Sequence, residues 1–303
     1  MVKRKLSTTP PLSVKAESST APVPPPSPQK AKKLKIQHDY ATESPFPDFP
    51  HPTHADATRV HELLTEAHGA RVRRTPDASS SANSAKTCGS VPNVIESLIG
   101  IILSQNTSGK NSSGAKRSLD SAFGRNNFAA IADAPVSAVV DAIRSGGLAN
   151  KKAATIQRVL RAIKEKHGAY SLQHLADVRS DGEIMRELMA YDGVGPKTAS
   201  CVLLFCLGRA SFAVDTHVFR LSKLLGWVPA RADRVQTQAH LDLRIPDDLK
   251  YGLHVLMIQH GRTCTGCKTK GKGSCILKAY LKERGRDVDA AVEEAATVKD
   301  ETT

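Results

Sequence analysis

The sequence predicts an all-α protein, and two observations lead to this class. Apolar residues recur at helical spacing in one segment after another, as in Val94, Leu98, Ile101 and Ile102. No segment shows the alternation of apolar and polar residues that a half-buried strand needs. Helical patterns separated by polar and glycine-rich turns, without strands, indicate helices packed on helices.

The expected helices follow one another along the chain. The first is expected over 56–68, where Val60, Leu63 and Leu64 form an apolar stripe, and the polar break over 71–89 is expected to be a loop. The run over 199–207 has no polar face, which is typical of a helix buried on all sides. The other helices are expected over 91–104, 113–123, 128–132, 135–145, 151–167, 172–176, 181–191, 218–225 and 249–260.

A glycine-rich turn leads directly into the run at 199–207. Gly193 and Gly195 permit positive φ or a close backbone approach, and Pro196 suits the first position of a helix. Lys197 is therefore expected at the amino end of the helix, where free N–H groups attract anions and the helix dipole disfavours a proton on a nearby amine. Lys197 is a candidate nucleophile, although such a turn can also bind phosphate without catalysis.

Asp215 follows Lys197 by 18 residues, in the segment Val214-Asp-Thr-His217. Taken alone, Asp215 or Thr216 could simply cap the helix expected over 218–225. The combination of the glycine-rich turn, the buried helix and this second polar segment is much more specific than either motif by itself.

Charge and cysteine content restrict the class of protein. The chain has 43 Lys and Arg against 30 Asp and Glu, a formal net charge of +13, which indicates a polyanionic partner, with nucleic acid first and anionic membrane second. No apolar run approaches the ~20 residues that span a bilayer and no signal peptide opens the chain, so we expect a soluble intracellular protein without a membrane association. Two of the six cysteines lie on the buried helix, which excludes a secreted disulfide framework.

Both ends of the chain are expected to be disordered, over 1–55 and 287–303. The first 55 residues are rich in Pro, Ser, Thr and Lys, and the last segment is acidic and alanine-rich, at most a frayed helix. Two basic clusters, at 3–5 and 30–35, predict a nuclear location, with an additional mitochondrial address left open. The alternative is a solvated tail that adds non-specific DNA affinity.

Gly193-Val-Gly-Pro-Lys-Thr-Ala199 followed by Val214-Asp-Thr-His217 resembles the helix-hairpin-helix DNA glycosylases, and within them the endonuclease III branch. The resemblance covers roughly 58–286. It implies two helical lobes with a DNA cleft between them: a central lobe over 91–213 that contains the hairpin, and a second lobe over 214–286 on which the first helix and loop, 56–90, pack. It also implies double-stranded damaged DNA as the partner, and we expect a monomer.

The resemblance assigns roles to individual residues. Lys197 would be the nucleophile and Asp215 the assisting carboxylate. Gln105 would fill the gap left by an extruded base, and Leu148, in the turn at 145–151, would wedge into the base stack. The remaining DNA contacts would come from Asn106, Lys151, Gly193, Val194, Gly195, Thr198 and His217, and Lys152 beside Lys151 would also suit a phosphate contact.

The activity that this resemblance implies is a bifunctional DNA glycosylase and AP lyase of base excision repair. It would remove damaged bases, oxidised pyrimidines first, and cleave the abasic strand by β-elimination through a lysine Schiff base. The nearest alternative is an 8-oxoguanine-type glycosylase, which also uses a lysine and an aspartate. The alternative outside this class is a non-catalytic helix-hairpin-helix protein that binds DNA phosphate only.

The C-terminal cysteines depart from the family. Endonuclease III relatives carry C-x6-C-x2-C-x5-C, which holds a [4Fe–4S] cluster, whereas here Lys272 and Leu281 stand at the second and fourth ligand positions. We therefore expect no iron–sulfur cluster, no metal and no other cofactor. The alternative is a zinc site formed by His260, Cys264, Cys267 and Cys275.

Overall fold

The computed structural model describes residues 42–73, 91–267 and 273–296, together with the isolated positions 28, 31 and 35. All regular elements in these residues are helices, which confirms the all-α class. None of the described helices is both long enough and apolar enough to cross a membrane. The basic clusters at 3–5 and 30–35 lie outside the described residues except for positions 31 and 35, so the nuclear location stays a prediction.

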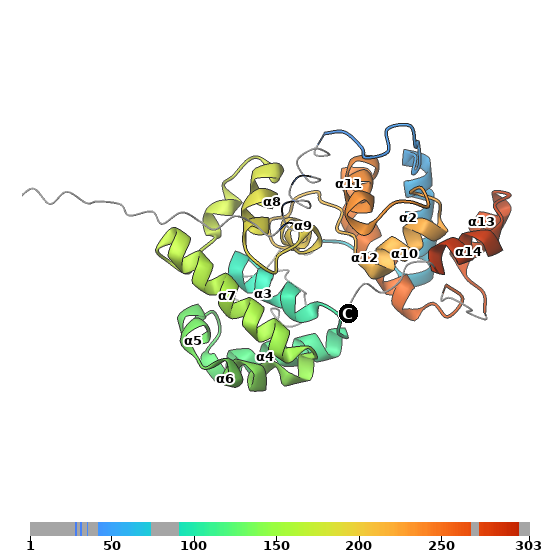
Figure 1. Ribbon diagram of the computed structural model, residues 1–303. Coiled ribbons are helices and arrows are strands. Elements are labelled where there is room, and N and C mark those ends of the chain that lie inside the picture. Colours follow the sequence, from blue (N-terminus) through green and yellow to red (C-terminus); the bar gives the residue numbers. More distant parts are fainter. Residues whose placement is uncertain are drawn as a thin grey trace, which may run out of the picture.

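Two separate hydrophobic cores define two lobes (Figure 1). The buried residues of the first core come from 94–213, and those of the second come from 46–64 and 212–295. The first lobe contains α3 (Val94–Ser104), α4 (Gly109–Phe123), α5 (Phe128–Asp133), α6 (Val136–Ile143), η1 (Arg144–Gly146), α7 (Ala149–His167), η2 (Gln173–Ala176), α8 (Asp181–Ala190) and α9 (Pro196–Phe205). The second lobe contains α2 (His54–His68), α10 (Thr216–Leu224), α11 (Arg234–Arg244), α12 (Asp247–Thr263), α13 (Ile276–Glu283) and α14 (Val288–Ala296).

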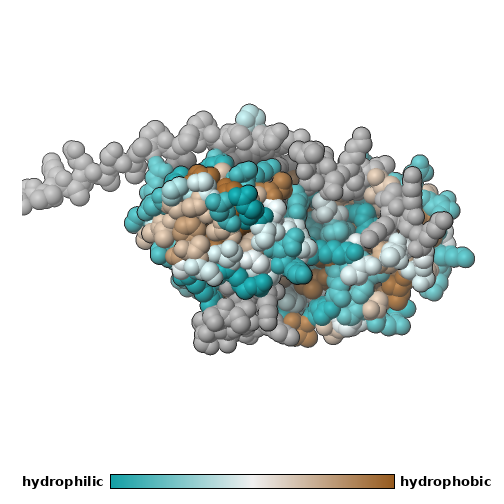
Figure 2. Space-filling model, turned by 90° about the horizontal axis from the view of Figure 1, so that it is seen from below, coloured by the Kyte–Doolittle hydropathy of each residue, from teal (hydrophilic) through white to brown (hydrophobic). Residues whose placement is uncertain are grey.

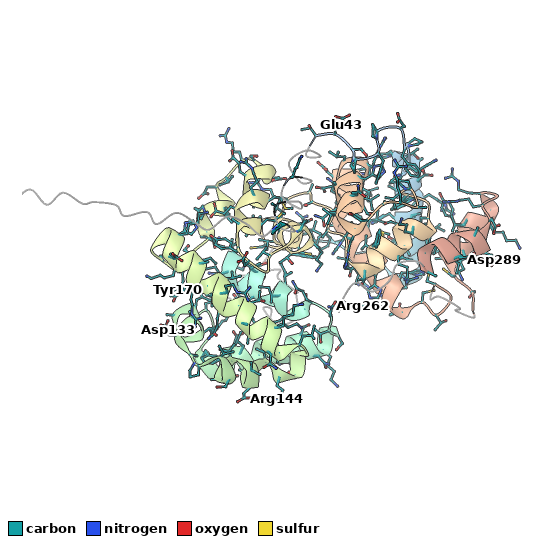
Figure 3. All side chains as sticks on the ribbon, in the orientation of Figure 1. Glu43, Asp133, Arg144, Tyr170, Arg262 and Asp289 are labelled. Carbon is teal, nitrogen blue, oxygen red and sulfur yellow. The ribbon has the colours of Figure 1, made fainter. Side chains whose placement is uncertain are left out.

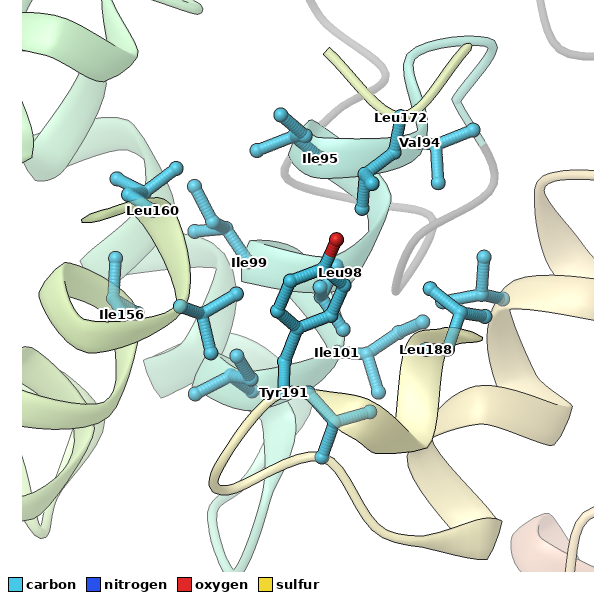
Figure 4. Packing of buried hydrophobic residues seen from close by; sticks show 14 of the residues in the cluster. Val94, Ile95, Leu98, Ile99, Ile101, Ile156, Leu160, Leu172, Leu188 and Tyr191 are labelled. Atoms are coloured by element: carbon cyan, nitrogen blue, oxygen red, sulfur yellow. The ribbon is translucent and has the colours of Figure 1, made fainter. Parts of the chain in front are cut away.

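Helix α3 is the centre of the first lobe. Its residues from Val94 to Leu103 are all buried, and it packs against α4, α7 and α9. Figure 4 shows the ring of Tyr191, just before the glycine-rich turn, among Leu98, Ile101 and Leu188. The turn and the start of α9 are thus fixed to the best-packed part of the lobe.

The ordered chain begins earlier than the sequence indicates. Phe46 is buried in the second core, the Ser44 hydroxyl lies 2.6 Å from Nδ1 of His240, and Nε2 of His240 lies 2.6 Å from the carbonyl of His51. Residues 42–53 therefore belong to the second lobe rather than to a disordered tail. Isolated aromatic side chains in a proline-rich segment give no periodic pattern, so their burial depends on a partner far away in the sequence.

The expectation of a disordered tail from 287 onwards also needs correction. Residues 288–296 form α14, which packs against α10 and α13 and buries Ala291 and Ala295 in the second core. An alanine-rich stripe is too small to stand out as an apolar pattern, but it allows a close approach of helices.

The expected helix over 172–176 is a short 3-10 turn, and α11 and α13 were not expected.

The two lobes meet where α9 faces α11 and α12. The ring of Phe205 lies edge-on to the rings of Tyr251 and His254, with centroids 5.8 and 5.6 Å apart. Figure 3 marks the separation of the lobes, with Arg144 on the first and Arg262 on the second. Seen from below, hydrophilic residues lie across the middle of the molecule, between the lobes, with only small separate hydrophobic areas (Figure 2).

Candidate active site

The glycine-rich turn before α9 contains Gly193 and Gly195, and the fold requires glycine only at Gly193. Gly193 has φ +96°, and a Cβ there would lie 2.4 Å from Cγ2 of Thr155. Gly195 has φ −103°, an extended conformation open to any residue, and a Cβ there would meet nothing within 4 Å. Gly193 is therefore required by the fold, whereas the expected positive φ or close approach within the chain does not occur at Gly195. The open space in front of Gly195 leaves the start of α9 accessible to a ligand.

Substituting alanine at Gly193 should affect mainly the stability of the fold, whereas alanine at Gly195 should affect mainly DNA binding. Gly193→Ala should lower the free energy of unfolding by at least ~2 kcal/mol, because it adds both backbone strain and a clash with Thr155. Gly195→Ala should cost less than about 1 kcal/mol, since only the helix cap changes. It should nevertheless weaken duplex DNA binding about 10-fold, because the added methyl group obstructs the approach of a phosphate. Thermal unfolding and fluorescence anisotropy check both expectations, and unchanged DNA affinity of Gly195→Ala would contradict a phosphate site there.

Lys197 is the second residue of α9, directly after Pro196, and its side chain is partly exposed. The helix behind it is buried from Thr198 to Leu204, so the lysine is mounted on a rigid element. Backbone N–H groups in the first turn of a helix have no partner within the helix. The position therefore combines an amine with N–H groups that attract an anion, as the sequence predicts.

Asp215 caps α10, and this bears out the simpler interpretation of the residue. Its Oδ1 accepts a hydrogen bond of 2.8 Å from the backbone N–H of Val218. Capping occupies one carboxylate oxygen, and the partly exposed carboxylate retains a second oxygen and its negative charge. The cap and a catalytic role are therefore compatible.

The buried segment Ser211–Val214 joins the two lobes and fixes the position of Asp215. Because this segment is not in a helix, side chains from α11 and α12 satisfy its backbone groups. The N–H of Phe212 donates to Oδ1 of Asp242 at 2.6 Å, and the N–H of Val214 donates to Oε1 of Gln238 at 3.3 Å. Side chains of the second lobe therefore fix the backbone that leads to Asp215.

His254, on α12, is a site residue that the sequence does not reveal. It is 1% exposed, and its Nδ1 donates to the carbonyl of Ala213 at 2.8 Å. Burial lowers the pKa of His254 to about 4, the positive charge of Lys197 acts in the same direction, and Asp215 acts in the opposite direction. The imidazole is therefore neutral at neutral pH and lies within electrostatic reach of both predicted catalytic residues. Only an ordinary apolar helix pattern surrounds it in the sequence, so no local signal marks it.

Gln105 and Thr198 meet although 93 residues separate them. Nε2 of Gln105 donates to the hydroxyl of Thr198 at 3.1 Å, which links the end of α3 to the first turn of α9. Thr198 is 3% exposed and Val194 is also buried, so DNA contacts at these two positions stay predictions and would come from backbone groups rather than from the side chains. Thr198 orients Gln105, Val194 packs in the first core, and only their backbone groups can reach a ligand.

Lys152 joins the two loops that were expected to enter DNA. Its Nζ donates to the carbonyls of Leu103 and Gly146, each at 2.8 Å, and the side chain is 3% exposed. The expected phosphate contact by Lys152 is therefore corrected to a structural role. Leu103 lies two residues before Gln105, and Gly146 lies two residues before Leu148, so Lys152 fixes the relative position of both loops.

The remaining predicted contacts lie on exposed or partly exposed positions. Leu148 is 52% exposed and has φ +50°, which aims this apolar side chain outward at the start of α7. Asn106 and Lys151 are exposed, and Asn106 has φ +49°. His217 is partly buried and packs against Gly261 of α12. A Cβ added at Gly261 would lie 2.8 Å from the Cβ of His217. Their DNA contacts stay predictions.

Comparisons with known proteins identify the family and agree with the fold. Residues 99–247 match the model of the HhH-GPD superfamily base excision DNA repair proteins. A provisionally named DNA glycosylase of Arabidopsis thaliana is 37% identical over 268 residues, which are 79% of this chain and 90% of that protein. Endonuclease III of Sulfolobus acidocaldarius is 30% identical over 64% of this chain and 84% of its own length. An endonuclease III structure solved in a non-covalent complex with DNA superposes with a TM-score of 0.55 and 26% identity, covering 76% of this chain and 96% of that one. The chain therefore belongs to the helix-hairpin-helix DNA glycosylases and is related to endonuclease III.

Proposed function

We propose that this protein is a bifunctional DNA glycosylase and AP lyase that removes damaged bases from double-stranded DNA and then cleaves the abasic strand. One observation carries the proposal. An amine, Lys197, stands at the amino end of α9 beside an open glycine turn, and a carboxylate, Asp215, lies close enough for both charges to act on His254. A nucleophile next to a stabilising carboxylate is the arrangement that Schiff-base glycosylase chemistry requires.

The chemistry assigns one role to each group. The neutral amine of Lys197 attacks C1′ of the deoxyribose, the bond from C1′ to the base breaks, and the base leaves with the electron pair and takes up a proton. The sugar ring then opens to an imine between Lys197 and C1′. Loss of a proton from C2′ expels the 3′ phosphate, and water later hydrolyses the imine and frees the lysine.

Asp215 stabilises the positive charge that develops on the sugar as the bond to the base breaks. A fixed carboxylate serves this role better than a mobile one because it needs no reorganisation during the reaction. The hydrogen bond to the N–H of Val218 and the buried linker before it provide that rigidity. Neutral His254 supports the linker through Ala213 without adding a second positive charge behind Lys197.

The damaged base must leave the duplex before Lys197 can reach its sugar, which costs a few kcal/mol of unstacking. Leu148 and Gln105 are suited to fill the vacated space, since one is an exposed apolar side chain at a loop tip and the other is an amide at the end of α3. Because Lys152 ties both loops together, the two side chains would enter DNA as one unit.

Oxidised pyrimidines are the substrate class that we propose, because the resemblance to endonuclease III implies them. The similarity to endonuclease III of Sulfolobus acidocaldarius and to the endonuclease III–DNA complex supports that relation. A trapping experiment with sodium borohydride tests both the reaction and the substrate. Duplexes with an oxidised pyrimidine, an 8-oxoguanine, a plain abasic site or no damage are incubated with the protein and reductant. We expect covalent capture on the oxidised pyrimidine and the abasic site, and none on undamaged DNA.

The other outcomes discriminate between the alternatives. Capture mainly on the 8-oxoguanine duplex would replace the proposed substrate class while keeping the mechanism. Base release without capture would indicate a glycosylase that lacks lyase activity. Binding to all duplexes, with neither base release nor capture on any of them, would show a DNA-binding protein and contradict the proposal.

A further inference from the structure

Four side chains far from Lys197 converge in the second lobe: His260, Cys264, Cys267 and Cys275. One ligand atom from each lies within 4.8 Å of all the others. Sγ of Cys267 is 3.0 Å from Nε2 of His260 and 3.0 Å from Sγ of Cys275, and Sγ of Cys275 is 3.5 Å from Nε2 of His260. Three of the four residues are buried, and Cys264 is partly exposed.

This cluster does not fit the four-iron cluster that the family resemblance implies. If Cys275 is counted as the third ligand, Lys272 stands at the second ligand position and Leu281 at the fourth. Leu281 is 1% exposed and packs in the second core. The outer ligands of a [4Fe–4S] cluster are held apart by the width of the cluster itself. The four atoms here are too close together for that. They suit a single ion, around which two thiolates at ~2.3 Å lie about 3.8 Å apart. The sulfurs of Cys267 and Cys275, now 3.0 Å apart, need to separate by less than ~1 Å to receive such an ion.

The local backbone explains why the four side chains meet. His260 and Cys264 are one helical turn apart at the end of α12, where the N–H of Cys264 donates to the carbonyl of His260 at 2.9 Å, so they lie on one face. Gly266 lets the chain turn back on itself, since a Cβ there would lie 2.8 Å from the carbonyl oxygens of Gly273 and Ser274. This close approach brings Cys267 next to Cys275, the residue before α13.

Neighbouring side chains form hydrogen bonds to the cluster residues and to their backbone, as residues around a metal site do to orient its ligands. Nδ1 of His260 lies 2.8 Å from Nε2 of His68, at the end of α2. If His260 donates this hydrogen bond, its Nε2 keeps a lone pair directed at the cysteine sulfurs, which is the tautomer that a metal ligand needs. Arg220 of α10 donates to the carbonyls of Cys267 and Gly261, which anchors the loop to the helix that Asp215 caps.

We propose that His260, Cys264, Cys267 and Cys275 bind one structural Zn²⁺ ion in a Cys₃His site. Four protein ligands leave no open position for catalysis, so the ion stabilises the fold. Binding displaces three thiol protons, and the bound ion joins α12, the loop after it and the start of α13. The site therefore takes the place of the iron–sulfur cluster of relatives as the link between these elements and α10. Of the two interpretations that the sequence leaves open here, metal-free or zinc-bound, the geometry favours zinc.

Metal content of the full chain is the direct test. Protein expressed with both iron and zinc in the medium and purified under reducing conditions should contain about one zinc per chain, almost no iron and no broad visible absorption. After chelation, Co²⁺ should bind and produce intense visible bands of tetrahedral geometry together with a thiolate charge-transfer band. The midpoint of thermal unfolding should fall on zinc removal and recover on its return.

Substitutions at the ligands and at a neighbouring histidine, each with a control, localise the site. Cys267→Ser and His260→Gln should lose the stoichiometric zinc, whereas Cys206→Ser, a change at a cysteine of the first lobe, should retain it. His68→Phe should keep all four ligands but lower zinc affinity about 10- to 100-fold in competition with a chelator. Glu66→Gln, an exposed change on the same helix, is its control and should leave the affinity unchanged.

Three results would overturn the proposal without depending on whether any variant folds. A brown protein containing iron would show that an iron–sulfur cluster forms despite the missing ligands. A disulfide between Cys267 and Cys275 in protein purified without reductant, with no zinc before or after reduction, would assign the pair to redox chemistry. Reduced protein that contains no zinc and binds no Co²⁺ would leave a metal-free cluster.

Discussion

Lys197→Gln should abolish covalent capture on damaged DNA and reduce strand cleavage by roughly a thousand-fold or more, because glutamine has no nucleophilic amine. Glutamine retains most of the length and polarity of lysine and is a good helix former, so α9 should still form. Thermal unfolding should therefore remain close to that of the unchanged protein. DNA affinity should decrease only by the contribution of one charge.

A matched substitution separates loss of the amine from loss of charge. Lys164→Gln removes one positive charge from the exposed end of α7, where Nζ donates to the carbonyl of Gly168 at 2.7 Å and lies 5.7 Å from the centre of the Tyr170 ring. This variant should capture damaged DNA as efficiently as the unchanged protein. Continued capture by Lys197→Gln would mean that another amine is the nucleophile, and it would remove the main support for the proposed mechanism.

Asp215→Asn should reduce the rate of base release about 100- to 1,000-fold while leaving the protein folded. Asparagine is as good an N-cap as aspartate, so the hydrogen bond to the N–H of Val218 can be retained. The negative charge near the sugar is lost. Single-turnover base release and thermal unfolding, measured on the same preparation, would show a large kinetic change at nearly constant stability.

Asp215→Ala provides the complementary measurement, because alanine removes both the charge and the cap. It should slow base release at least as much as Asp215→Asn and should also destabilise the fold by ~1 kcal/mol. If Asp215→Asn unfolds, or if it releases bases at the normal rate, then the role of Asp215 is that of a helix cap alone.

Much of the fold and of the candidate active site could be predicted from local sequence. The helical class follows from apolar spacing, and the position of Lys197 follows from the order glycine, proline, lysine, apolar run. These signals depend on residues within a few positions of one another. For the same reason the burial of Lys152 could have been predicted, since it continues the apolar face of Ile156, Val159 and Ile163 at helical spacing.

The partners of the site residues depend on contacts between distant parts of the chain, and no local pattern reports them. Gln105 and Thr198 are 93 residues apart, His254 and Ala213 are 41 apart, and His68 and His260 are 192 apart. Such pairs form only when helices that are distant in the sequence pack against each other, within a lobe or between the lobes, so the sequence could not distinguish an exposed Thr198 from a buried one.

The sequence by itself determined the helical class, the glycine-rich turn with Lys197 at its helix, and the second motif that contains Asp215. Each of these is encoded by backbone preference and apolar spacing over one or two turns of chain. Only the tertiary structure decided that Gly193 rather than Gly195 is required by the fold, that residues 42–53 and 288–296 join the second lobe, and that His254 lies behind the site. It also brought His260 and three cysteines together. The physical reason is that burial and side-chain contacts are set by packing between elements, which sequence spacing within one element does not specify.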